Sequence, residues 1–184
     1  YMEEFSLEDL KLMYAENSID SNLKVLSGSF VLFIFNKKLN QLDVISDRTC
    51  SKQLFIYKND SEFSFSNNIF EFSNRDLTIN KGSLGFYLSN GYLLGSHTLF
   101  NEIFIITYGK KIEFCNGKFL TKQYWDYSFT KENKNNNLAD ILYELINNSV
   151  KKRMLGNKNV VLLSGGYDSR SIIAFFINNL KKIN

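Results

Sequence analysis

The stretch "VVLLSGGYDSRSIIAFF", from Val160 to Phe176, decides how the carboxyl-terminal part of this chain is interpreted. An apolar run rich in β-branched residues stops at Ser164-Gly165-Gly166, and an amphipathic pattern follows. We interpret "NVVLL", residues 159–163, as a buried parallel strand, residues 164–168 as a loop, and the segment from Ser169 as a helix. The apolar face of that helix would hold Ile172, Ile173, Phe176, Ile177 and Leu180. This order predicts the opening of an α/β domain.

The loop itself has the composition of an anion site. Gly165 and Gly166 allow positive φ angles and a close approach of the backbone to a phosphate, while Ser164 and Ser169 add hydroxyl donors. Asp168 would repel a phosphate unless a Mg²⁺ ion lies between them. A plain tight turn with Ser169 as an N-cap explains the glycines but not the whole pattern. The sequence therefore predicts a nucleotide-binding loop.

Composition narrows the class of protein. The chain has 184 residues, and 44% of them are hydrophobic, which is enough to form a sizeable core. Its net charge of +3 is weak, which argues against a nucleic-acid or membrane-surface role. No window approaches the ~20 apolar residues of a membrane span. Cys50 and Cys115 lack metal-ligand spacing, so we expect a reduced, cytoplasmic protein. The first residues are acidic, unlike a signal peptide, and the start at Tyr1 suggests a fragment.

The rest of the chain predicts two domains. Residues 1–127 combine a short helix at 7–14 with buried strand patterns and hairpin turns at Asn59-Asp60 and Cys115-Asn116-Gly117, as in an α+β domain dominated by antiparallel strands. Residues 128–137 are polar and predict a linker. Residues 138–184 begin with a helix capped at Gly156. Its apolar face would hold Leu138, Ile141, Leu142, Leu145 and Ile146.

Two resemblances cover nearly the whole chain. The loop at 164–169 resembles the Ser-Gly-Gly-x-Asp-Ser pyrophosphate loop of the ATP pyrophosphatases. The segment "LSGSFVLFIFNKKLNQLDVISDRTCSKQLFIY" resembles class II glutamine amidotransferase domains fused to asparagine synthetase, as do "SNNIFEF", "YLSNGYLLGSHTLFNEIFII" and "KQYW". The matching positions in the first of these segments are Gly28, Phe30, Asp47, Arg48, Lys52, Leu54 and Phe55.

The resemblance to the asparagine synthetase family implies a partial four-layer αββα glutaminase-like sandwich, followed by the start of a Rossmann-like synthetase domain. It implies Mg·ATP-dependent adenylation of a substrate carboxylate and amide formation with ammonia from glutamine. Gly165 and Gly166 would hold pyrophosphate through backbone amides, Ser164 and Ser169 would donate hydrogen bonds to it, and Asp168 would hold Mg²⁺. Leu162 and Leu163 would lie near the nucleoside. The resemblance also allows a homodimer.

The chain departs from the family at several positions. Thr49-Cys50 stands where the family has glycine, Gln53 replaces a proline, Tyr167 a leucine, and Leu7 falls where a glutamine-binding aspartate is expected. The family's glutaminase nucleophile is an amino-terminal cysteine, whereas the first cysteine here is Cys50. We therefore identify no catalytic residue in this chain and expect the chain alone to be inactive.

Other candidates have simpler explanations. Cys50 is expected to be an inert thiol, His97 a structural or solvated side chain, and Asp47-Arg48 an ion pair that orders the sheet. Three interpretations of function stay open. They are an ammonia-using amidotransferase, an adenylating ligase without glutaminase activity (one that uses an internal amine, as in β-lactam synthetases, or one of surface-polysaccharide or specialised biosynthesis), and a non-catalytic fragment.

Overall fold

The structure is a computed structural model that describes residues 6–16, 18–60, 62–129, 137–154 and 158–180. The chain divides into two compact units, Tyr1–Ser128 and Phe129–Asn184. No helix in the described ranges combines the length and the apolar character needed to cross a membrane.

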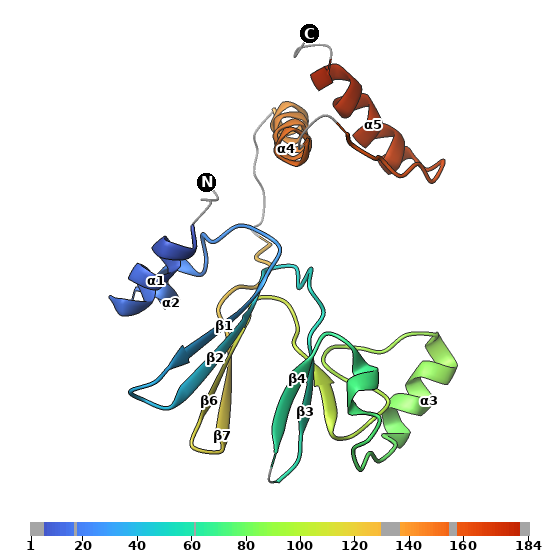
Figure 1. The fold of residues 1–184 in the computed structure, drawn as a ribbon. Helices are drawn as coiled ribbons and strands as arrows, with labels where there is room; N and C mark the ends of the chain where they lie inside the picture. The colour runs from blue at the N-terminus through green and yellow to red at the C-terminus, as the bar shows by residue number, and fades with distance from the viewer. Residues whose placement is uncertain (1–5, 17, 61, 130–136, 155–157, 181–184) are drawn as a thin grey trace. The chain divides into compact units, whose positions relative to one another are not determined.

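The first unit contains two antiparallel sheets (Figure 1). The larger sheet has the order β1-β2-β6-β7, with β1 at Val31–Asn36, β2 at Gln41–Ser46, β6 at Lys110–Cys115 and β7 at Lys118–Gln123. The smaller sheet has the order β4-β3-β5, with β4 at Phe63–Ser66, β3 at Phe55–Lys58 and β5 at Ile103–Ile105. These elements confirm the α+β expectation and both predicted hairpins. The glutaminase-like four-layer sandwich stays a prediction.

The two sheets face each other across an apolar layer. Val44 and Ile112 of the larger sheet pack with Ile56 of the smaller sheet and with the flanking residues Leu54 and Ile106. Side chains alternate between the two faces along a strand. For that reason the neighbouring Ile45 points to the opposite face of the larger sheet and joins a second cluster. The period-two pattern of the sequence thus separates the residues of the two layers.

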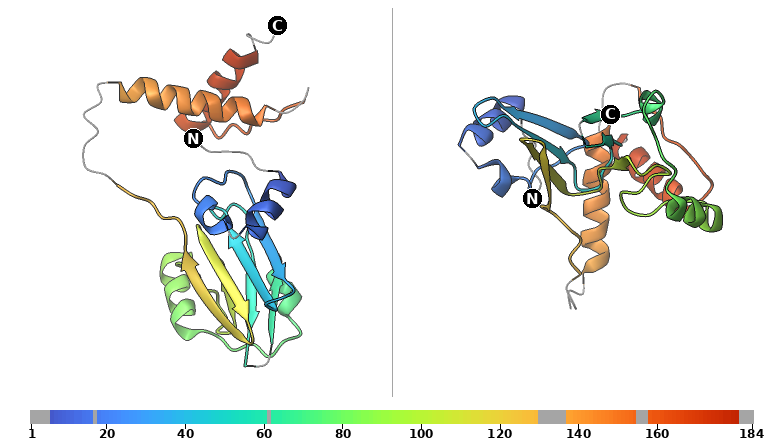
Figure 2. Two further views of the ribbon diagram at one scale, coloured as in Figure 1. Left: turned by 90° about the vertical axis from the view of Figure 1, so that its left-hand side faces the viewer. Right: turned by 90° about the horizontal axis from the view of Figure 1, so that it is seen from below.

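Helices cover the outer face of the larger sheet. α1 spans Leu7–Ala15 and begins with a capping box, in which the Ser6 hydroxyl accepts from the Asp9 amide and the Asp9 carboxylate accepts from the Ser6 amide. α2 spans Ile19–Asn22, and its Ile19, together with Leu23, packs on Ile45. Figure 2 shows both helices beside the strands of this sheet.

A buried charge fixes α2 to the larger sheet. The Lys111 ammonium lies 2.7 Å from an Asp20 oxygen of α2, and 3.2 Å from both the Asp43 and the Glu113 carboxylates of the sheet. Burial opposes the charge of Lys111, but these three partners outweigh it and raise its pKa above the ordinary value. The ion-pair cluster therefore joins a helix to a sheet that its apolar contacts alone would orient loosely.

The smaller sheet carries its own helical segments. The short 3₁₀ helix η1, Ile69–Phe72, stacks Phe72 on Tyr57 of β3 at a ring separation of 5.7 Å. α3 spans Lys81–Asn90, is capped by the Asn80 side chain at its start and ends at Gly91 in a left-handed conformation.

Asp47 joins three separate segments of the first unit through hydrogen bonds. Its carboxylate, 2% exposed, accepts from the amides of Phe30, Thr49 and Ser51 at 2.9 to 3.2 Å. The hydroxyls of Thr49 and Ser51 donate to it as well, at 2.9 and 2.6 Å. Its backbone carbonyl accepts from the amide of Gly109, which precedes β6. The segment before β1, the loop after β2 and the turn before β6 are therefore held at one residue.

The expected ion pair between Asp47 and Arg48 is wrong. Within the described ranges no ion pair joins these two side chains; Arg48 donates to the Leu26 carbonyl at 3.4 Å and lies 5.8 Å from the Trp125 ring. Adjacent residues in extended backbone point in opposite directions, and the Asp47 oxygens are already occupied by amides and hydroxyls. The carboxylate is neutralised by oriented dipoles instead of by a guanidinium.

Replacing Asp47 tests this arrangement. Asp47→Asn presents an NH₂ group to donors and removes a buried charge that accepts several hydrogen bonds, so we expect the free energy of unfolding to fall by about 3 kcal/mol. Chemical denaturation measures it. The exposed Asp76→Asn is the matched control and should change stability by less than about 0.5 kcal/mol. Equal effects in the two variants would contradict the role given to Asp47.

Gly109 is the second constraint at this point. Its φ of +58° lies in the left-handed region, and a Cβ there would overlap the carbonyl oxygen of Trp125. The amides of Tyr124 and Trp125 both donate to the Gly109 carbonyl. The close approach brings the end of β7 against the turn before β6, and only glycine permits it.

Two alanine variants separate the clash from the backbone strain. Gly109→Ala suffers both and should lower the free energy of unfolding by about 3 kcal/mol. Gly117→Ala also has a positive φ, +75°, but meets nothing within 4 Å, so it should cost about 1 kcal/mol. Thermal and chemical denaturation compare the two. If the Gly109 variant were as stable as the Gly117 variant, the Trp125 backbone would be able to move away from the added Cβ with no loss of free energy.

The second unit consists of two packed helices in its described part. α4 spans Leu138–Arg153 and α5 spans Tyr167–Leu180. Tyr143 and Phe175 pack at a ring separation of 4.8 Å. The buried Asn179 donates to the Asn147 side chain at 2.8 Å. Both predicted helices are confirmed, with α5 beginning slightly before Ser169.

The predicted strand at residues 159–163 is wrong. Residues 158–164 have no regular secondary structure, and Val160 and Leu162 are 90% and 87% exposed. A parallel strand requires hydrogen bonds to a neighbouring strand, and the described residues of this unit contain none. The helix cap expected at Gly156 and residues 130–136 of the expected linker lie outside the described residues.

Candidate functional site

The predicted nucleotide loop brings its two serines together. The Ser164 and Ser169 hydroxyl oxygens are 3.1 Å apart, and the Ser164 amide donates to the Ser169 hydroxyl at 3.3 Å. The Ser169 hydroxyl donates to the Gly166 carbonyl at 3.1 Å. These contacts fold residues 164–169 into one turn, so that both hydroxyls lie at the beginning of α5.

The glycines shape that turn. Gly165 has a φ of +78° and a Cβ there would meet nothing within 4 Å, so its role is conformational freedom and not avoidance of a clash. α5 starts directly afterwards at Tyr167. The first amides of a helix lack intrahelical acceptors, and the helix dipole favours negative charge near them. The loop is exposed and has the donors of an anion site.

Asp168 belongs to a groove between the two helices of this unit. The groove has a volume of about 600 Å³ and is lined by Leu145, Ile146, Ser149, Val150, Arg153, Asp168, Ser171 and Ile172. Asp168 is the one acidic residue in this lining, and the described residues contain no cluster of three or more metal-ligating side chains. A single carboxylate matches the way proteins hold Mg²⁺, which keeps water and phosphate oxygens as its other ligands. Asp168 therefore fits a Mg²⁺ ion that arrives with a phosphate.

Arg153 is a groove residue that the sequence did not single out. Its guanidinium donates to the Ser149 carbonyl at 2.9 Å and to the Ser149 hydroxyl at 2.7 Å. In the sequence Arg153 is the last of three consecutive basic residues, Lys151, Lys152 and Arg153. Basic residues at the carboxyl end of a helix are explained by their interaction with the helix dipole, without any role in a site. The structure adds a positive charge to the lining of the groove that contains Asp168.

The position of Leu162 and Leu163 near the nucleoside stays a prediction. They are 87% and 61% exposed and contribute no wall to the groove. Arg170, which follows the second serine, instead stacks on Tyr167 at 4.5 Å and donates to the Gly166 carbonyl at 3.4 Å. Arg170 and Tyr167 thus pack on each other at the rim of the turn.

In the first unit, Cys50 has the surroundings of an unreactive thiol. Its Sγ donates to the Ile106 carbonyl at 3.0 Å, and burial and the Asp47 carboxylate raise the pKa of the thiol. Both cysteines are free. His97, the sole histidine, is exposed and its amide donates to the Leu94 carbonyl in a turn. Neither side chain is paired with the other as a nucleophile and base.

Alkylation tests the state of Cys50. In the Cys115→Ser variant at pH 7.5, native protein should react with iodoacetamide about tenfold or more slowly than urea-unfolded protein, because the attacking thiolate is scarce and partly buried. Mass spectrometry follows the modification. The Cys50→Ser variant, which keeps Cys115, is the matched control. Equal rates for native and unfolded protein would contradict the description of Cys50 as an unreactive thiol.

The comparisons with known proteins concern the first unit. Its two facing antiparallel sheets, joined at Asp47, define an α+β domain in which Phe30 and Asp47, far apart in the sequence, are hydrogen-bonded. The family model of the glutamine amidotransferase domain matches residues 8–125. The chain therefore belongs to the glutamine amidotransferase domain family. The search of curated proteins returned no match.

This family defines the kind of chemistry. A glutamine amidotransferase domain supplies ammonia from the side-chain amide of glutamine, so the match supports an enzyme with glutamine as its nitrogen donor. The matched residues end at 125, and the loop at 164–169 lies outside them. The family match therefore supports glutamine as the nitrogen donor, and it does not bear on the function of the loop.

Proposed function

We propose that this chain belongs to an asparagine synthetase-like amidotransferase, in which a substrate carboxylate is adenylated by ATP and ammonia from glutamine then forms an amide. The observation that carries the adenylation half is the turn at 164–169. Two serine hydroxyls 3.1 Å apart lie beside the free first-turn amides of α5, with Asp168 at the adjoining groove. The amidotransferase family supports glutamine as the source of ammonia.

The residues of the turn divide the binding of Mg·ATP among them. Ser164 and Ser169 donate hydrogen bonds to the β- and γ-phosphates, and the backbone at Gly165 and Gly166 approaches them closely. Asp168 holds Mg²⁺, which neutralises phosphate charge and favours pyrophosphate as the leaving group. Attack of the carboxylate on the α-phosphate gives an acyl adenylate and pyrophosphate. Ammonia then displaces AMP from the acyl carbon and an amide results.

The groove beside Asp168 suits the binding of the phosphate groups of Mg·ATP. Arg153 is fixed by Ser149 and adds positive charge, while Leu145, Val150 and Ile172 give the groove apolar lining. A fixed positive charge attracts an anion through the Coulomb interaction. The groove therefore supports an anionic ligand better than the exposed turn would alone.

Binding of magnesium pyrophosphate to this chain tests the loop directly. Ser164→Ala and Ser169→Ala each remove a hydroxyl donor to a charged ligand and should weaken binding about tenfold or more, as measured by titration calorimetry. Asp168→Asn should abolish the dependence of binding on Mg²⁺. Asn178→Ala, an exposed position of α5 outside the lining of the groove, is the matched control and should bind as the unchanged chain does.

The products of ATP cleavage test the reaction class. With glutamine and aspartate as the trial carboxylate, we expect the natural protein to release AMP and pyrophosphate. Release of ADP and phosphate would contradict the adenylation mechanism. Magnesium pyrophosphate that bound equally well to the Ser164, Ser169 and Asn178 variants would contradict the assignment of the loop.

A further inference from the structure

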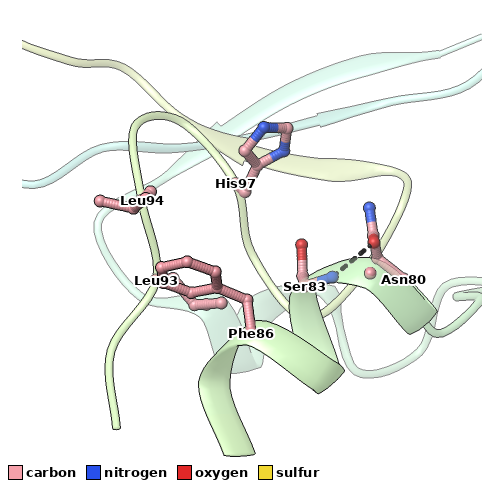
Figure 3. A pocket seen from close by; sticks show the side chains of 7 residues that line it. Asn80, Ser83, Phe86, Leu93, Leu94 and His97 are labelled. Carbon is pink, nitrogen blue, oxygen red and sulfur yellow. Dashed lines mark hydrogen bonds between the residues drawn. The ribbon is translucent and has the colours of Figure 1, made fainter. Parts of the chain in front are cut away.

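The first unit has a hollow that neither the amidotransferase family nor the loop of the second unit accounts for. It has a volume of about 370 Å³ and lies between the first turns of α3 and the loop that follows the helix (Figure 3). Its lining residues are Asn80, Gly82, Ser83, Phe86, Leu93, Leu94 and His97. Pockets that bind small molecules begin at about this size.

The walls of the hollow are held by backbone hydrogen bonds. On one side the Asn80 amide donates to the Leu99 carbonyl, which ties the start of α3 to the chain entering β5. On the other side His97 pairs with Phe104 of β5 in an antiparallel bridge, and the Ile105 amide donates to the Ser96 carbonyl. Both walls are therefore anchored to the same strand, and the hollow is a fixed feature of the fold.

Ser83 is the residue that points to a ligand. It is 8% exposed, and its hydroxyl has no hydrogen-bond partner among the residues that the structure describes, although its amide is capped by the Asn80 side chain at 2.9 Å. Figure 3 shows the hydroxyl pointing into the hollow, toward His97. The oxygen itself reaches the surface of the hollow, so a ligand there can accept its hydrogen bond in place of water.

The charges around Ser83 favour an anion. The hollow lies at the amino end of α3, where the helix dipole is positive and where the first amides have no intrahelical acceptors. None of the seven lining residues is acidic, and His97 adds two ring nitrogens on the opposite wall. A carboxylate placed between Ser83 and His97 would meet donors from both sides.

The remaining lining is apolar. Phe86 forms one side of the hollow and is fixed by an edge-to-face contact with Tyr92 at 5.8 Å, while Leu93 and Leu94 form the other. These side chains offer no partner to a polar group, so an inorganic anion would leave them unused. The lining suits a ligand with an apolar body attached to its charged end.

We propose that this hollow binds a small organic carboxylate with an apolar body, with the carboxylate at Ser83 and His97 and the body on Phe86, Leu93 and Leu94. The site is independent of the adenylation proposal, because all its residues belong to the first unit. A ligand there would be recognised by a hydrogen bond at one end and by apolar burial at the other.

Octanoate is the probe, and ¹H–¹⁵N NMR of the chain is the measurement. We expect saturable shifts at Ser83, Phe86 and His97, with weaker binding by 1-octanol, which has the same tail without the charge. Ser83→Ala keeps a good helix former and should weaken octanoate binding about tenfold or more. Ser89→Ala, on the same helix with its hydroxyl on the Gly85 carbonyl, is the matched control and should bind as the unchanged chain does.

Three outcomes would overturn the proposal. Shifts that do not saturate would show that the hollow does not select this ligand. Equal binding of octanol and octanoate would show a merely apolar surface. Unchanged affinity in Ser83→Ala, with the helix intact by its NMR spectrum, would show that the buried hydroxyl does not hold the carboxylate.

Discussion

The carboxylate of Asp47 is the interaction on which the rest of the first unit depends. It ends β2, accepts hydrogen bonds from the segment that enters β1 and closes the loop that leads toward β3. Through its carbonyl it also holds Gly109, and thus the entry of β6 beside the end of β7. The facing of the two sheets follows from this point, because the chain leaves the larger sheet here and enters the smaller one.

Two buried charges serve different purposes in this unit. Asp47 is neutralised by amides and hydroxyls, which are short and directional and so fix the geometry of a loop. Lys111 is neutralised by three carboxylates, one of them on α2, so it connects two elements that no backbone hydrogen bond links. Removing Lys111 would leave the buried Asp43 carboxylate without its ion-pair partner, which is costly.

The sequence predicted the first unit well because its strands are local patterns. The apolar runs of β1 and β2 and the turns at Asn59-Asp60 and Asn116-Gly117 can be recognised in short windows. The strand predicted at 159–163 failed for the opposite reason, since an apolar run becomes a parallel strand only with distant partners. Asp47-Arg48 was misjudged because adjacency in sequence favours an ion pair, whereas the true partners of Asp47 include an amide seventeen residues earlier.

In the candidate sites, too, local features could be predicted from the sequence and features that depend on distant residues could not. The Ser-Gly-Gly turn carries its donors within a few residues, so its geometry followed from the motif. Arg153 and Ser83 were missed, because a basic residue at a helix end and a serine inside a helix both have ordinary explanations. Only the fold shows that one lines the groove of Asp168 and that the other directs an unpartnered hydroxyl into a hollow.

The pKa of Asp47 tests the central claim most directly. Burial alone would raise this pKa, but the hydrogen bonds from Ser51 and Thr49 outweigh burial and lower it below the ordinary value. A lowered pKa means that the carboxylate stabilises the fold above its unfolded pKa of about 3.9 and that this stabilisation is lost as the pH falls through the folded pKa. A ¹³C NMR titration of the Asp47 carboxyl carbon should therefore show a midpoint below 3.9, with unfolding following at still lower pH. A midpoint at or above 3.9 would contradict the account.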